Sequence, residues 1–186
     1  MKHLEMKKKV LGLIEELNPN NEHLTDDADI ETKYIEVTNQ ILFELARIKK
    51  IPKYLELKVS KDDLITFEKI EQACGYEVYQ IDTASGVNYV SKANGTVLKI
   101  LESGTLELDV FIYPERVTVQ NSKSYEFELG HDVLEIMPYG IAGDLLKSDQ
   151  SAEHGRMYSS RYEQMLQRLD PRNQMPTIFI EGGVDI

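Results

Sequence analysis

The chain has 186 residues, of which 41% are hydrophobic and 28% charged, and its formal net charge is −11. This balance is ordinary for a globular protein with one sizeable core, and it excludes a chain that is disordered throughout. The negative charge argues against binding the outside of DNA by neutralising phosphates, although it suits a conduit through which DNA slides without being held.

No apolar run approaches the roughly 18 residues needed to cross a bilayer. The first residues include acidic side chains where a signal peptide would continue apolar. We therefore expect a chain retained in the cytoplasm of the cell that makes it. Its single cysteine, Cys74, cannot form an intramolecular disulfide and is expected to be a small buried apolar residue.

Two helices are predicted before residue 53. In the first, apolar residues recur at helical spacing until Asn18 and Pro19 provide a stop: Leu4, Val10, Leu11, Ile14 and Leu17. The second begins after Thr25, which is suited to cap its first turn, and ends near Lys49 or Lys50, before Pro52. Its apolar stripe is the longest in the chain: Ile30, Tyr34, Val37, Ile41, Leu45 and Ile48.

Short segments rich in valine, isoleucine and aromatic residues follow between residues 54 and 129, and turn residues separate most of them. Residues 62–75 are ambiguous between a short helix and an irregular segment. Asn94-Gly95 predicts a two-residue hairpin, and Ser103-Gly104 predicts the next reversal. We expect a meander of antiparallel strands, with a last strand over residues 125–129.

Two more helices are predicted from residue 133 to residue 170. Pro138 and Gly140 lie inside the first pattern and predict a kink or a late helix start. Asp132 is expected to cap this helix, in preference to forming an acid-base pair with His131. The cap of the second helix is expected from the polar connection, at Ser148, Asp149 or Ser151.

The predicted fold class is therefore α+β. A helical body, residues 1–53 and 130–170, is interrupted by a β-rich insertion, residues 54–129, and followed by an extended tail, residues 171–186. The tail is too short to bury its own apolar side chains, so we expect it to pair with a sheet edge of this subunit or of another chain.

Catalytic and metal-binding patterns are scarce. The four histidines are scattered, and neither C-x-x-C nor a glycine-rich phosphate loop occurs. We therefore expect no enzyme activity, cofactor or metal. In the last helix and its exit, five residues are subunit-interface candidates: Tyr158, Arg161, Tyr162, Arg168 and Arg172. Core positions are an alternative for the tyrosines, and a solvated helix face is the preferred explanation for any single arginine.

The stretches MPYGIAGDLLKSD, YSSRYEQMLQRLDPR and IEGGVDI, after two helices and a β-rich insertion, resemble the head-to-tail connector (adaptor, or head-completion) proteins of tailed bacteriophages and related prophages. The order of elements is similar along the whole chain, while the specific part covers about Met137 to Ile186. The β insertion is large relative to the simplest helical-bundle members of that family.

The resemblance implies a ring of about twelve subunits that attaches beneath the portal vertex, completes the head and forms part of the DNA exit channel. Its implied partners are the portal protein, other copies of the chain, a downstream tail or neck protein, and DNA that passes without sequence-specific binding. Its implied location is the head-tail junction of the virion, reached from the host cytoplasm and not from a membrane. The family docks its C-terminal segment on the portal, which maps here to Met175, Thr177, Ile178, Phe179, Ile180, Glu181, Gly182, Gly183, Val184, Asp185 and Ile186.

Two other classes of function stay open. A small ligand- or peptide-binding α+β module is the first alternative, and an enzyme of unrecognised chemistry is the second. For a connector, we expect a lumen lined by acidic or neutral side chains and a β insertion that contacts neighbouring subunits or the next ring, because the edges of a meander must be paired or protected.

Overall fold

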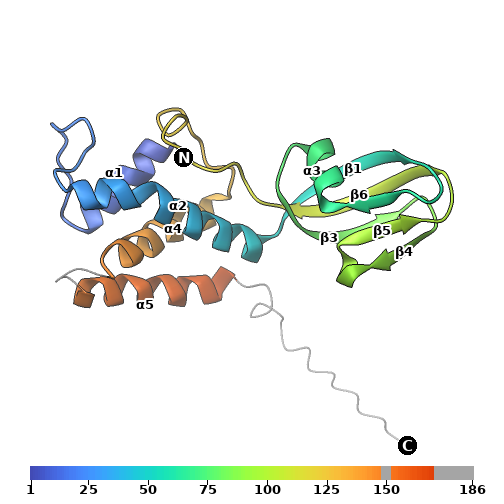
Figure 1. The fold of residues 1–186 in the computed structure, drawn as a ribbon. Helices are drawn as coiled ribbons and strands as arrows, with labels where there is room; N and C mark the ends of the chain where they lie inside the picture. Colours follow the sequence, from blue (N-terminus) through green and yellow to red (C-terminus); the bar gives the residue numbers. More distant parts are fainter. Residues whose placement is uncertain (148–151, 170–186) are drawn as a thin grey trace, which may run out of the picture.

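The computed structural model describes residues 1–147 and 152–169, and it confirms the predicted α+β class. A helical body and a β domain lie side by side and give the described chain an elongated shape (Figure 1). The helical body contains α1 (His3–Leu13), α2 (Ala28–Lys49), α4 (His131–Leu145) and α5 (Ala152–Leu169). The β domain contains β1 (Ile51–Val59), β2 (Leu64–Thr66), α3 (Phe67–Cys74), β3 (Val78–Ser85), β4 (Tyr89–Lys92), a 3-10 turn η1 (Ala93–Gly95), β5 (Val97–Ile100) and β6 (Gly104–Ile112).

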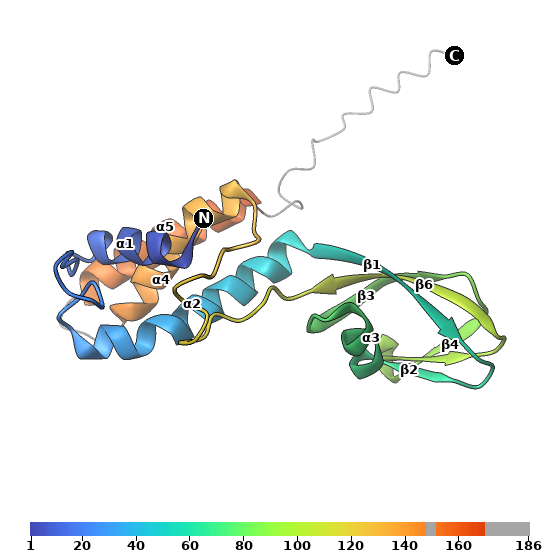
Figure 2. The ribbon, with the colours of Figure 1, turned by 90° about the horizontal axis from the view of Figure 1, so that it is seen from above.

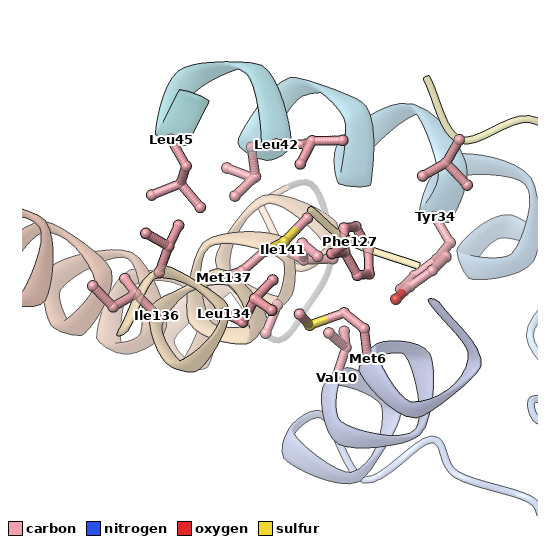
Figure 3. Close-up of a cluster of buried hydrophobic side chains, with 14 of the residues drawn as sticks. Met6, Val10, Tyr34, Leu42, Leu45, Phe127, Leu134, Ile136, Met137 and Ile141 are labelled. Atoms are coloured by element: carbon pink, nitrogen blue, oxygen red, sulfur yellow. The ribbon is translucent and has the colours of Figure 1, made fainter. Parts of the chain in front are cut away.

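Helix α4 is the centre of the helical body, where it contacts α1, α2 and α5. Ten of its 15 residues are buried, and its exposed polar side chains, His131, Asp132 and Glu135, are confined to its first turns. In the core, Met137 and Ile141 lie between Leu42 of α2 and Met6 of α1 (Figure 3). Helices from before and after the β domain thus build one core, as the apolar stripes predict.

The N-terminal helices differ from prediction in their ends. Helix α1 stops at Leu13, because Glu15 adopts a left-handed φ of 61°, so Leu17 lies outside it and is exposed together with Leu4. Asp27, and not Thr25, caps α2: its carboxylate accepts hydrogen bonds from the amides of Asp29 (2.8 Å) and Ile30 (3.1 Å). The first helix is therefore shorter than predicted, and the second begins later.

Helix α4 begins at His131 and continues through Pro138, so the predicted late start is wrong. Asp132 does not cap it, since Gly130 occupies the N-cap position without a side-chain hydrogen bond. Instead, Lys49 in the last turn of α2 donates to the Asp132 carboxylate at 2.5 Å. This hydrogen bond is the main reason that the pKa of Asp132 is lowered.

The β domain is a pair of stacked three-stranded sheets and not a single meander. The strand orders are β1-β6-β3 and β2-β5-β4, and all pairs are antiparallel. The chain therefore changes sheets between β5 and β6, where Ser103-Gly104 was expected to join neighbouring strands. The ambiguous residues 62–75 form β2 and α3, whose Ile70 is fully buried in the domain's core.

Two local predictions are also corrected. The connection between β4 and β5 spans residues 93–96, because Ala93, Asn94 and Gly95 all adopt positive φ, and is longer than a two-residue hairpin. Residues 125–129 form only an isolated bridge, between Lys2 and Glu126, and not a strand. Tyr125, Phe127 and Leu129 nevertheless bury their side chains in the core of the helical body, so this end of the predicted insertion packs with the helices.

Candidate functional site

The predicted interface tyrosines on α5 face inward. The Tyr162 hydroxyl donates to Glu44 of α2 at 2.9 Å, and the ring lies where a Cβ on Gly140 would approach it to 2.9 Å. Burial, followed by the charge of Glu44, raises the pKa of Tyr162. Tyr158 donates to the backbone carbonyl of Leu13 in α1. These tyrosines thus hold α5 against the other helices of the same subunit.

The arginines of α5 are placed differently. Arg161 and Arg168 are exposed, and the guanidinium of Arg161 lies 4.6 Å from the centre of the Tyr139 ring. Met157 is also exposed on this helix. The outer face of α5 therefore remains a surface where another chain could bind. Arg172, the predicted caps Ser148, Asp149 and Ser151, and the whole predicted docking segment from Met175 to Ile186 lie outside the described residues.

An aromatic joint connects the helical body to the β domain. Arg47, near the end of α2, donates to the Tyr113 hydroxyl and covers the ring at 5.3 Å. Tyr113 packs on Tyr79 of β3 and on Phe43 of α2, with ring centres 4.8 Å and 4.9 Å away. Arg116 lies 4.7 Å from the centre of the Phe43 ring. Stacked side chains from both bodies thus meet where the chain crosses between them.

The returning chain is also fixed to α2. The Asn39 side chain donates to the Val117 carbonyl and accepts from the Val117 amide, each at 2.8 Å. This is the pairing that a neighbouring strand would provide, made here by one amide side chain. Together with the aromatic joint, it attaches the chain that leaves the β domain to α2.

A groove of about 990 Å³ lies beside α2. Its walls come from α1 and from residues 116–123, and an ion pair between Lys7 and Glu31 crosses it. Its floor is one face of α2, since lining residues recur every four positions: Glu31, Ile35, Asn39 and Phe43. This mixed lining could take a peptide or a small polar ligand.

Three polar side chains are buried near this groove. His3, Tyr34 and Thr38 each have a side-chain atom without a hydrogen-bond partner in the described part of the chain. The His3 and Tyr34 rings meet edge to face at 5.5 Å. Burial is the largest cause that lowers the pKa of His3, so its neutral form is favoured. The group is a polar region of the core and not an acid-base pair with a carboxylate.

Within residues 1–147 and 152–169, no cluster of histidine, cysteine, aspartate and glutamate could hold a metal ion. In the same ranges, no helix is both long and apolar enough to span a membrane. Cys74 is half-buried, and its Sγ contacts the carbonyls of Glu71 and Tyr76. The main features of the described residues are therefore the outer face of α5, the groove beside α2 and the aromatic joint.

Sequence reasoning missed the aromatic joint and the role of the small residues in α4. A Cβ on Gly143 would come within 3.0 Å of the Ser159 amide nitrogen, so Gly140 and Gly143 allow α5 to lie close against α4. The spacing Gly-x-x-Gly in a buried helix was the available signal. No signal connects Arg47 with Tyr113, because 66 residues separate them.

Comparison with known family models and with curated proteins found no match for this chain. The resemblance to phage connectors therefore stays a prediction.

Proposed function

We propose that this chain is a structural subunit of the ring-shaped adaptor between the portal vertex and the tail of a tailed bacteriophage. It completes the head after DNA packaging and forms part of the exit channel. The observation that carries the proposal is the arrangement of the fold: a helical body of α1, α2, α4 and α5 carries a β domain at one side, and the aromatic joint connects the two. Such a shape suits a subunit that must touch several neighbours at once.

The proposed partners follow from this role. The segment Met175 to Ile186 docks on the portal protein, copies of the chain form a ring, and a tail or neck protein binds the far side. DNA passes through the lumen without sequence-specific contacts, and lumen-facing side chains are acidic or neutral, as the net charge of −11 permits. The protein acts at the head-tail junction of the virion after assembly in the host cytoplasm, and it needs no cofactor.

Electron microscopy of the purified full-length chain mixed with portal rings from the same genome tests the proposal. We expect an added ring of density on one side of the portal. The chain cut after residue 174 is the matched control, and it should leave the portal bare. Portals that stay bare with the full-length chain at micromolar concentration would contradict the proposal.

A ligand- or peptide-binding module is the second candidate, and the groove beside α2 is the observation that favours it. Ile35→Glu places a charge in its floor. A peptide that binds wild type but not the Ile35→Glu variant, with portal binding unchanged, would support the second candidate. Portal binding by both wild type and this variant, without binding of any peptide, would favour the adaptor, because portal docking is assigned to Met175 to Ile186.

A further inference from the structure

The outward-facing surfaces of the two sheets of the β domain differ in composition. Their inner faces share one core, to which β1, β3 and β6 contribute from one sheet and β2 and β5 from the other. Since side chains alternate along a strand, the remaining positions point away from that core, in opposite directions on the two sheets. Figure 2 shows β1 and β6 on one side of the domain and β2 on the other.

The outer face of the β2-β5-β4 sheet is apolar with lysines, and we name it the apolar face. Leu64 and Val90 flank Lys99 in one row of the sheet, and both are about half exposed, at 48% and 45%. Leu101 lies beyond Lys99 on the same strand side and is 44% exposed. Lys92 follows Val90 at the next outward position of β4. Three of the largest exposed apolar side chains of the described chain thus gather on one small sheet.

The outer face of the β1-β6-β3 sheet is acidic, and we name it the acidic face. Glu56 lies directly opposite Glu107, and Tyr54 lies directly opposite Asp109. Like charges directly opposite each other destabilise a strand pair, so this arrangement costs the isolated domain stability. Lys58, two positions after Glu56, also lies on this face.

Hydroxyl groups orient the carboxylates of the acidic face. Tyr54 donates to Glu56 at 2.9 Å, Thr83 to Asp109 at 2.7 Å and Ser85 to Glu107 at 3.1 Å. The bond to Glu56 is the main cause that raises the pKa of Tyr54 to about 12, so the phenol stays a neutral donor. Each carboxylate keeps further lone pairs available for a cation.

We propose that the apolar face of one copy of this chain packs on the acidic face of the next copy. Lys92 and Lys99 then approach Glu107 and Asp109, and the leucine and valine side chains cover the ring of Tyr54. Pairing of like faces is disfavoured. Two apolar faces would bring two Lys92 ammonium groups together, beside Lys99 groups that lie 3.0 Å from the Asp62 carboxylates, and two acidic faces would bring six carboxylates together. The charge pattern of one domain therefore selects a second copy, turned head to tail.

This contact uses two different faces, so each copy keeps one face open after binding. Repetition closes into a ring or continues as a filament, depending on the rotation between copies. The inference deepens the proposed function, on which the closure into a ring rests. It assigns to the β domain the side-by-side contact between subunits.

Sedimentation velocity of the full-length chain tests the inference. Val90→Glu damages the apolar face alone, and the double variant Glu107→Lys/Asp109→Lys damages the acidic face alone. We expect wild type to form species larger than dimers as concentration rises, and each variant to remain monomeric. An equimolar mixture of the two variants should form dimers and nothing larger, because each partner contributes its intact face. Lys69→Glu and Glu68→Lys, on the exposed side of α3, are matched charge controls that should assemble like wild type.

Several outcomes would overturn the inference. Wild type could stay monomeric at the highest attainable concentration. The variants could assemble like wild type, or the mixture of the two variants could stay monomeric. Sensitivity to Val90→Glu alone would indicate pairing of two apolar faces and would equally overturn it. Far-ultraviolet circular dichroism of each variant shows that the domain is folded. The proposed function is judged separately, by binding of full-length wild type to portal rings.

Discussion

The hydroxyl of Tyr79 on β3 donates a hydrogen bond to the backbone carbonyl of Ala46, in the last turn of α2, at 3.2 Å. This carbonyl also accepts a hydrogen bond from the Lys50 amide at 2.9 Å, so the Tyr79 hydroxyl is its second donor. The β domain thus adds a hydrogen bond to the last turn of α2, beside the stacked rings of the aromatic joint.

Tyr79→Phe should lower the free energy of unfolding by about 0.5 to 1.5 kcal/mol, the usual net contribution of one hydrogen bond. The ring stacking on Tyr113 is retained in this variant. Urea unfolding measures the change. Tyr54→Phe, which removes an exposed hydroxyl from the acidic face, is the control and should change stability less. An equal loss in both variants would contradict a special role for the joint.

Gly140→Ala should destabilise the helical body by about 1 to 3 kcal/mol, as overpacked cores generally do. The added Cβ would lie 2.9 Å from the Tyr162 ring and 3.1 Å from Ile41. Thermal unfolding provides the measurement. Gly12→Ala in α1 is the matched control, since its Cβ would meet nothing within 4 Å, and it should stabilise by about 0.5 to 1 kcal/mol. Opposite signs for the two variants are the expected result.

Stability should fall as the pH drops below about 6.5. His3 is buried near Tyr34 and Phe127, with Lys7 and Glu31 nearby, and its pKa is lowered from 6.5, chiefly by burial. The unfolded chain therefore takes up a proton at a higher pH than the folded protein does. Stability that is fully present above pH 6.5 is lost as the pH falls towards the lower pKa of the folded state.

Urea midpoints between pH 8 and pH 5 measure this dependence. His3→Gln should flatten the part of the curve that begins near pH 6.5. A wild-type curve that is already flat between pH 6.5 and pH 5 would refute the assignment to His3.

Removal of residues 175–186 should leave the helical body folded and abolish attachment to portal-bearing heads. The described core extends to Leu169, and Tyr158 and Tyr162 hold α5 against α1 and α2. Co-sedimentation with heads and circular dichroism of both forms give the two readouts. Equal binding by the truncated chain would reject the docking role, and loss of helical signal would show that the segment belongs to the subunit's own fold.

Periodicity predicted the helices of the body because each buries one stripe against α4, and burial is what apolar spacing records. It failed at residues 125–129, whose strand-like alternation serves to insert Tyr125 and Phe127 into a helical core. Periodicity also led to the wrong prediction of a single meander. Alternation shows that a strand has two different faces, but it does not show which strand lies beside it. The aromatic joint depends on contacts across dozens of residues, which local patterns do not carry.

The β domain leaves and rejoins the helical body through one paired ribbon. Ile51 and Ile112 are directly opposite partners on β1 and β6, so their Cα atoms lie about 5 Å apart. A short turn could therefore replace everything between them without moving α2 or the returning chain. The β domain could therefore be exchanged as a unit. A gene could acquire, lose or replace it in one recombination event while the helical body keeps its fold.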